Sequence, residues 1–307
     1  MELEFIRWLN NRIAAHPGAR LGIGDDAALL EWADRGDCVV TSDLLMDGAH
    51  FRLEAGDPPK RIGHKALAVN LSDLAAMASR PVAAFVSLAL PRNGGLPLAQ
   101  DLVEGMLPLA EQFQVAIAGG DTNIWGGPLV ISVTAVGMAT EHGVLRRDGG
   151  RPGDWLLVTG ALGGSLLGRH LDVEPRVAEA LVLNDQFEIH ACLDISDGLA
   201  LDLSRLASAS GCGAILEAAA IPVSDAARQL AQRGDGRSSP LDHALSDGED
   251  FELLFSVAPD VGQKILAAQP LAVPIRHIGE LTDEPQLWLR REDATLEPLA
   301  ARGFEHQ

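Results

Sequence analysis

The stretch KRIGHKALAVNLSDLAAMASR, residues 60–80, has the hydrophobic period of an amphipathic helix. Its apolar stripe consists of Leu67, Leu71, Leu74 and Ala78. Asn70 and Asp73 are three residues apart, so they share a face that lies about 130° from the centre of that stripe. Aspartate is a poor former of helix interiors. The stretch therefore predicts a helix, ended by Pro81, that presents a polar pair for a purpose other than packing.

Strand-like and helix-like segments alternate on both sides of this helix, which favours an α/β or α+β fold. In the first half we expect strands at 38–43, 82–90, 115–119 and 128–139, and a helix with a proline interruption at 98–113. In the second half we expect strands at 155–160, 189–196 and 250–257, a helix at 198–210 capped by Gly211, and a loop at 231–240. The glycine-rich, charged stretch 141–155 is the best candidate for a joint. Two domains, 1–140 and 141–307, are therefore predicted.

Composition limits the classes of partner. The chain has 307 residues, 47% of them hydrophobic, and a formal net charge of −19. Such an acidic chain lacks the basic surface that displaces counterions from nucleic acid, so no nucleic-acid partner is expected. The longest apolar run, 82–90, falls far short of the ~20 residues that a membrane helix needs, so no membrane partner is expected either. The acidic segment 1–13 has the spacing of an amphipathic surface helix and not of a signal peptide.

The three cysteines are widely spaced and form no C-x-x-C pair. Neither a disulfide framework nor a zinc site is indicated. We therefore expect a reducing, cytoplasmic environment.

Several common catalytic signatures are missing: a Walker loop, the protein-kinase motifs, H-E-x-x-H and G-x-S-x-G. Short acidic motifs beside glycines stand at the predicted element ends instead: GIGDDAA (22–28), TSDLLMDGAHF (41–51), AGGDTN (118–123), LDISDGL (193–199) and SDGEDFEL (246–253). Any one of them could be a turn or a helix cap. Together with Asp73 they are too many for that reading, because loops after strands gather at one sheet edge.

Carboxylates gathered in one place cannot all stay ionised unless a cation lies among them. Mg²⁺ suits such oxygen ligands, and it also binds substrate phosphates. This explains why Asp25 and Asp26 occupy a G-x-G-x-x-A turn, whose spacing is typical of a phosphate loop. Metal ions would stand between these carboxylates and the phosphates.

In this order, the motifs GIGDDAALL, TSDLLMDGAHF, KALAVNLSDLAAM, GGDTN, RRDGGRPGDWLLVTG, LDISDGLALDL and SDGEDFELLF resemble those of the thiamine-monophosphate kinase family. That family belongs to the superfamily of aminoimidazole ribonucleotide synthetase. The resemblance implies two α/β domains, with the N-terminal domains of a homodimer pairing through a β-barrel and ATP bound near the dimer interface. It implies ATP-dependent phosphorylation of thiamine monophosphate to thiamine diphosphate with several Mg²⁺ ions.

The resemblance also assigns roles to individual residues. It implies metal ligands at Asp26, Thr41, Ser42, Asp43, Asp73, Asp121, Asp194 and Asp197. It implies ATP contacts at Gly120, Asp121, Arg147 and Ser196. It implies contacts to the thiamine substrate at His50, Glu249 and Phe304. Arg146 could replace its neighbour Arg147, and Asp47 is interpreted as a turn acid.

Three positions depart from the family pattern. Asn123 stands where threonine is frequent. Asp247 replaces a usual glycine and adds a charge beside Glu249. The stretch between TGALGGSLLG (159–168) and RHLDVEPR (169–176) is shorter than the family usually has, which leaves the local shape of the second domain open.

The implied acceptor is already a phosphate monoester, whose second pKa is near ~6. Its attacking oxygen is largely anionic at neutral pH, so no general base is assigned and direct in-line transfer is expected. Two alternatives stay open: another ATP-dependent reaction of the superfamily, and a non-catalytic protein that binds nucleotides or metals. An acidic Ca²⁺ module is a weaker option, because no D-x-D-x-D-G loop is present.

Overall fold

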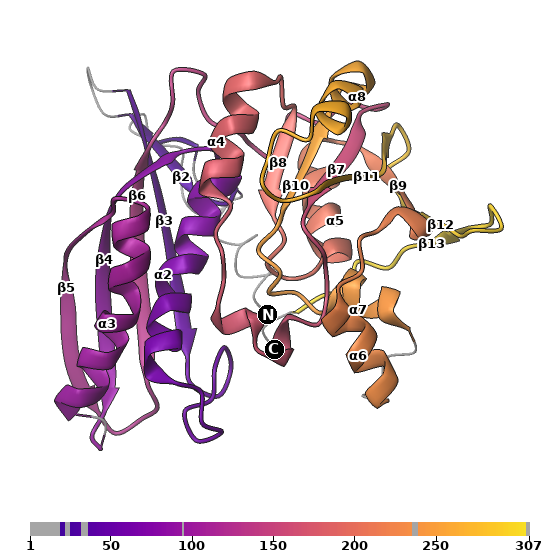
Figure 1. The fold of residues 1–307 in the computed structure, drawn as a ribbon. Coiled ribbons are helices and arrows are strands. Elements are labelled where there is room, and N and C mark those ends of the chain that lie inside the picture. The colour runs from indigo at the N-terminus through magenta and orange to yellow at the C-terminus, as the bar shows by residue number, and fades with distance from the viewer. Residues whose placement is uncertain (1–18, 22–24, 32–35, 94, 235–238, 305–307) are drawn as a thin grey trace.

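A computed structural model describes residues 19–21, 25–31, 36–93, 95–234 and 239–304. The first half of the chain forms a six-stranded sheet with two helices, α2 and α3, and the second half forms a seven-stranded sheet with the remaining helices (Figure 1). The elements of the first half are β1 (Ala19–Leu21), β2 (Ala28–Glu31), β3 (Asp37–Met46), α2 (Pro59–Ala76), β4 (Arg80–Pro91), α3 (Gly95–Gln112), β5 (Ala116–Trp125) and β6 (Val130–Met138).

The second half contains short 3₁₀ turns as well as strands and helices. Its elements are β7 (Trp155–Thr159), η2 (Ser165–Leu167), η3 (Arg169–Leu171), α4 (Val177–Gln186), β8 (Ala191–Asp194), α5 (Leu199–Ala209), β9 (Gly213–Glu217), η4 (Ala218–Ala220), α6 (Asp225–Arg233), α7 (Pro240–Ser246), β10 (Leu253–Val257), α8 (Pro259–Ala268), β11 (Ile275–Thr282), β12 (Leu287–Arg290) and β13 (Leu296–Pro298). The mixed α/β class predicted from the alternation is confirmed.

The first sheet has the strand order β1-β2-β3-β6-β4-β5, and only the β4–β5 pair is parallel. Helices α2 and α3 cover one face (Figure 1). The other face, which we call the open face, carries exposed apolar side chains, among them Leu44, Met46 and Phe85. The sheet ends in β1 and β5, so the described part of this single chain contains no closed barrel.

The second sheet has the order β13-β12-β9-β11-β7-β10-β8, with only β9 and β12 parallel. Strand β8 is therefore an edge strand, and it lies against α2 of the first half. Its last residue, Asp194, is thereby brought next to the helix that carries Asp73.

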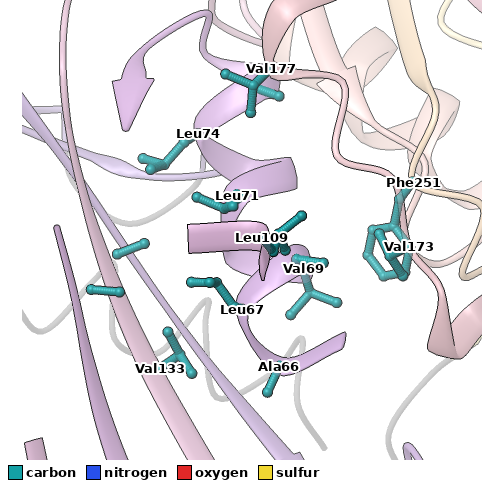
Figure 2. Packing of buried hydrophobic residues seen from close by; sticks show 14 of the residues in the cluster. Ala66, Leu67, Val69, Leu71, Leu74, Leu109, Val133, Val173, Val177 and Phe251 are labelled. Carbon is teal, nitrogen blue, oxygen red and sulfur yellow. The ribbon is translucent and has the colours of Figure 1, made fainter. Parts of the chain in front are cut away.

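Helix α2 lies between the two sheets and is buried along almost its whole length. Figure 2 shows its leucines, such as Leu71 and Leu74, between Val133 of β6 on one side and Val177 and Phe251 from the second half on the other. Both halves contribute to this core, so α2 packs against residues of the first half and of the second half. Polar residues in the buried part of α2, such as Lys65, Asn70 and Ser72, therefore lie between the two halves.

Some sequence-based boundaries are wrong. Helix α2 ends at Ala76 and not at residue 80, because Ala78 adopts a left-handed φ of 46° that stops the helix. Pro81 lies within β4 beside a register shift, a place where strands tolerate proline. Strand β5 continues through GGDTN to Trp125, so this motif lies inside a strand and not at its end.

Helix α3 begins at Gly95, three residues before the predicted start, and runs through Pro108 without the predicted interruption. The C-terminal boundary of α5 is confirmed. Gly211 follows α5 with φ 67°, and the Cys212 N–H donates to the Ala207 carbonyl at 2.8 Å, the six-to-one bond of a Schellman motif. The expected helix at 1–13 and the glycines at 22 and 24 lie outside the described residues. All three cysteines are buried free thiols. Within the described ranges, no helix combines the length and apolar character of a membrane span.

Candidate active site

Three acids from distant parts of the sequence meet beside α2. Carboxylate oxygens of Asp26, Asp73 and Asp194 all lie within 4.8 Å of one another. Asp26 comes from the turn before β2, Asp73 from the interior of α2 and Asp194 from the end of β8. The structure thus brings the first sheet, the central helix and the second sheet to one point, which we call the acidic cluster.

Hydrogen bonds from α2 and β3 fix the cluster. Thr41 Oγ1 donates to Asp73 Oδ2 at 2.5 Å, and Ser72 Oγ donates to Asp194 Oδ2 at 2.5 Å. Thr41 and Asp43 are two residues apart on β3, so both side chains face the helix. The Asp43 N–H donates to Asn70 Oδ1 at 3.2 Å, which accounts for the polar residue beside Asp73 on α2.

The pKa values of the acids in and beside the cluster are raised, because these carboxylates are buried close to one another. Burial, followed by the neighbouring Asp197 and Asp26, raises the pKa of Asp43 to about 6. Burial, followed by nearby carboxylates, raises the pKa of Asp73 and of Asp194 well above the usual value. Each buried acid disfavours ionisation of the next, which is the condition that a bound cation relieves.

Arg147 is the cation that the chain itself supplies. Its Nε donates to Asp26 Oδ2 at 2.8 Å, its Nη2 pairs with Asp26 Oδ1, and its N–H donates to Asp25 Oδ2 at 3.3 Å. The guanidinium is largely buried, yet Asp26 and Asp25 raise its pKa. Arg146 instead pairs with exposed Asp148, so in this structure Arg147 is the arginine that reaches the acidic cluster. Asp25 and Asp26 therefore anchor an arginine from the 141–155 segment in this structure.

Asp197 and Ser196 follow β8 in a turn that is fixed by hydrogen bonds to Asp202 and by ion pairs with Arg205. Asp202 accepts the N–H groups of Asp197 and Gly198 at 2.9 and 3.0 Å, and Arg205 bridges Asp202 and Asp197 at 2.7 and 2.5 Å. Burial raises the pKa of Asp202 to about 7 in spite of Arg205. The sequence analysis did not single out this pair, although Asp202 lies within LDISDGLALDL.

Phe304 is placed near the same turn. Its N–H donates to the Asp197 carbonyl at 2.9 Å, and its side chain is 45% exposed. Phe304 is thus held next to a residue of the candidate site.

The other expected substrate contacts, His50 and Glu249, are joined by a residue that the sequence analysis missed. Lys65 of α2 donates to the His50 carbonyl at 2.8 Å and pairs with the Glu249 carboxylate. Lys65 is the first residue of the quoted motif KALAVNLSDLAAM, and it stands at helical spacing from Arg61 on the face that meets the second half. The place of Lys65 at the start of this motif was the feature of the sequence that could have identified it as a site residue.

Three expected site residues lie elsewhere in this chain. The Ser42 side chain, between Thr41 and Asp43 on β3, is on the open face, where Oγ lies 2.9 Å from Thr134 Oγ1. Asp121 and Gly120 lie on the edge strand β5. Asp121 pairs in register with Ser87 on the open face, three strands and about 14 Å from β3. Within one chain, strand alternation thus separates these side chains from the acidic cluster.

The departures from the family pattern have structural accounts. The Asp247 carboxylate turns inward, where it accepts the Gly164 N–H at 2.9 Å and lies 3.0 Å from His243 Nδ1. Where the stretch before Arg169 is shortened, Gly168 and the following segment 169–176 hold α2 to the second half, because Arg61 of α2 donates to the Gly168 carbonyl at 2.8 Å. There Arg61 Nε donates to Asp172 at 2.7 Å, and Arg176 forms two bonds of 2.7 and 2.8 Å to buried Glu252.

Asp47 is the turn acid expected, because it accepts the Leu53 N–H at 3.1 Å. Asn123 donates to Asp121 at 3.0 Å on the exposed edge strand, so the substitution leaves the acidic cluster untouched.

The donors of the acidic cluster fit a hard divalent cation. They are buried carboxylate oxygens close enough to share an ion, with a threonine hydroxyl beside them. Two cavities of about 590 and 380 Å³ lie elsewhere, one beside α6 and α7 and one between α3 and residues 172–179. The acidic cluster is the better candidate site, because in it convergent carboxylates have pKa values raised by burial and by one another.

Two family models cover most of the chain. Residues 24–139 match the AIR synthase related protein N-terminal domain, and residues 145–290 match the AIR synthase related protein C-terminal domain. Fold and site together define the class of AIR synthase related proteins.

Individual relatives narrow the class. The thiamine-monophosphate kinase of Rhodopirellula baltica is 45% identical over 313 residues, which cover 100% of this chain and 97% of that protein. The solved structure of AaThiL complexed with AMPPCP and TMP superposes with a TM-score of 0.85 at 25% identity, covering 100% and 97% of the two chains. The crystal structure of the thiamine-monophosphate kinase of Stenotrophomonas maltophilia superposes with a TM-score of 0.73 at 35% identity. The match covers 94% of this chain and 95% of that one. The chain belongs to the thiamine-monophosphate kinase family.

Proposed function

We propose that this protein transfers the γ-phosphoryl group of ATP to thiamine monophosphate, giving ADP and thiamine diphosphate. The observation that carries the proposal is the convergence of Asp26, Asp73 and Asp194 in a chain that is 45% identical to a thiamine-monophosphate kinase over its full length. The relative complexed with AMPPCP and TMP supports the same pair of substrates.

Mg²⁺ would be held by the acidic cluster and the side chains beside it, namely Asp26, Thr41, Asp43, Asp73, Asp194 and Asp197. When bound, it would screen the repulsion between two polyanions and stabilise the charge on the transferred group. Ser42 and Asp121 lie on the open face, so Asp121 and Gly120 would reach a nucleotide only across an interface with a second protomer. Ser196 and Arg147 would contact the nucleotide from within the chain.

The chain's own residues position the reactants. An oxygen of the acceptor phosphate attacks the γ-phosphorus, the bond to the β–γ bridging oxygen breaks, and ADP leaves with the electron pair. No proton has to be removed, because the acceptor phosphate has a second pKa near ~6. Arg147 supplies a forked donor for phosphate. His50, Glu249 and Phe304 would orient the thiamine group, with the aromatic ring against its cation.

The wider assignments follow from the same proposal. The apolar open face supports pairing of two N-terminal domains in a homodimer, because large apolar patches mark interaction surfaces. A domain boundary near residue 140 agrees with the division of the two sheets between Met138 and Trp155. Three buried free thiols suit a reducing cytoplasm, where we place the enzyme.

The test is a coupled assay of ADP release with thiamine monophosphate, with and without Mg²⁺, followed by chromatography of the product. We expect Mg²⁺-dependent release of ADP and formation of thiamine diphosphate in equal amounts. Unphosphorylated thiamine and a ribonucleotide of the aminoimidazole pathway serve as comparison acceptors. ADP release that prefers the ribonucleotide would favour another reaction of the superfamily. Tight ATP binding without turnover would leave a non-catalytic binding protein.

A further inference from the structure

Lys65 is a buried cation outside the acidic cluster. Its side chain is only 1% exposed, and its Nζ donates to the His50 carbonyl at 2.8 Å and pairs with Glu249. A buried ammonium is costly unless it is paired and hydrogen-bonded. Lys65 is therefore fixed by partners from both halves of the chain: the loop after β3 and the loop before β10.

Glu249 lies in a loop whose backbone is held in an uncommon conformation. Its φ is 56°, and Phe251 two residues later has φ 51°, both in the left-handed region that residues with side chains seldom adopt. Backbone bonds hold the loop: Glu249 N–H to the Ser196 carbonyl at 2.7 Å and Phe251 N–H to the Ile195 carbonyl at 2.8 Å. These bonds fix the main chain, whereas Lys65 fixes the carboxylate.

Lys65 also lies at a defined distance from the acidic cluster. It precedes Asp73 by eight residues on α2, which is about 12 Å along the helix axis. The Lys65–Glu249 pair therefore belongs to the end of the site away from the phosphoryl group that is transferred. A change at Lys65 should accordingly affect the organic part of the acceptor and leave the nucleotide unaffected.

We propose that Lys65 is a positioning residue that holds Glu249 and the His50 loop at the spacing required by the acceptor's cationic thiazolium group. This inference rests on the proposed function. Lys65 itself is a cation and does not contact the thiazolium. It sets the direction of the carboxylate that does.

The experiment compares Lys65→Met, Lys65→Arg, Glu249→Gln and the double variant Lys65→Met/Glu249→Gln. Lys264→Met is the matched control, because Lys264 pairs with Asp260 by a similar ion pair but is 67% exposed on α8. Steady-state KM values for thiamine monophosphate and for ATP, melting temperature, and calorimetric binding of thiamine monophosphate without ATP are measured for each.

For Lys65→Met we expect the KM for thiamine monophosphate to rise by about tenfold or more, while the KM for ATP stays within about twofold. The double variant should be no worse than the worse single variant, because both changes remove one shared unit. Lys65→Arg should recover part of the affinity. Lys264→Met should match the wild type throughout.

A lower melting temperature with unchanged affinity for thiamine monophosphate would make Lys65 a purely structural residue and overturn the proposal. Equal increases in both KM values, or additive effects in the double variant, would overturn it as well. If Lys65→Met does not fold, Lys65→Arg and Glu249→Gln carry the same comparison by calorimetry. A wild type that does not turn over thiamine monophosphate refutes the proposed function itself, whereas an active wild type with unaffected Lys65 variants refutes only this inference.

Discussion

Asp73 is an aspartate in a helix interior, where this residue type is unfavourable, and its side chain is buried beside other carboxylates. We therefore explain its presence by what it binds. Asp73→Asn keeps the shape of the side chain, and its amide oxygen can still accept the bond from Thr41. We expect Mg²⁺-dependent turnover to fall by about 100-fold or more. The melting temperature of the metal-free protein should not fall, because a buried acid with a raised pKa is replaced by a neutral group.

The matched control for Asp73→Asn is Asp185→Asn, since Asp185 is 64% exposed and pairs only with His142 among the ion pairs of the described chain. It should retain wild-type turnover. Full activity in Asp73→Asn would contradict the place of this residue in the site, and collapse of its fold would contradict the electrostatic account.

Asp43 gives a prediction with a defined pH window. In the unfolded chain an aspartate ionises near ~3.9, whereas burial and neighbouring acids raise the pKa of folded Asp43 to about 6. Between these values the folded state keeps a proton that the unfolded state loses. The stabilising contribution is thus present below the lower value and is lost as the pH rises through the higher one.

Asp43→Asn removes this dependence. In chelator, the melting temperature of the variant relative to the wild type should therefore be higher at about pH 7.5 than at about pH 4.5. Thermal melts of both proteins at the two pH values measure the difference. A gap that does not change with pH, or that changes in the opposite direction, would argue against the raised pKa.

At the scale of elements, the contact between α2 and α3 is set by two glycines. A Cβ on Gly63 would lie 1.9 Å from the Leu102 carbonyl oxygen, and a Cβ on Gly105 would lie 1.8 Å from the Lys60 carbonyl oxygen. The two backbones therefore touch directly, and even one methyl group must push the helices apart. Since α2 carries Lys65, Ser72 and Asp73, a displaced helix also displaces the site.

Gly63→Ala should lower the free energy of unfolding by about 1–3 kcal/mol and should lower turnover as well. Gly126→Ala is the control, because no atom lies within 4 Å of its Cβ position, and it should change stability by less than about 0.5 kcal/mol. Urea unfolding of the two variants tests the contact. If Gly63→Ala and Gly126→Ala have the same free energy of unfolding, the two helices can move apart at no cost and the account of the contact is wrong.

Some elements could be predicted from hydrophobic period, as α2, α3 and β6 show, whereas others were not expected, among them β9, β11, β12, α4, α6 and α8. Their ends were less predictable: nothing in the spacing marks Ala78 as left-handed, and the glycines of GGDTN hid the continuation of β5. The candidate site was predictable as a set of motifs, but the partners within it were not. Lys65 and Glu249 are 184 residues apart, and only the docking of the two halves makes them neighbours.

The same limit applies to faces of a sheet. The resemblance placed Ser42 beside Thr41 and Asp43, yet a strand sends successive side chains to opposite faces. Similarly, Asp121 belongs to a motif that matches the family but lies on the open face of an edge strand. A motif identifies which residues matter together, whereas the register of the sheet decides which side chains can meet within one chain.

For the whole molecule, the open face makes a prediction about assembly. Phe85 is 44% exposed and Leu44 is 53% exposed on this face, although both belong to well-paired strands. We expect a dimer in solution and a shift to monomer in Phe85→Glu, measured by light scattering during size-exclusion chromatography. Leu296→Glu on β13, where the leucine is 48% exposed, is the control and should stay dimeric. A monomeric wild type would refute this use of the face.

The placement of Asp194 on the edge strand β8, bonded to Ser72 of α2, has a consequence for the time course of folding. Either half alone would hold only part of the ligand set, so a dication can recognise the chain only after the two halves have docked. If docking follows the rate-limiting barrier, Mg²⁺ will leave the refolding rate unchanged and slow the unfolding rate. Resistance to proteolysis in the cell would then track the supply of the ion.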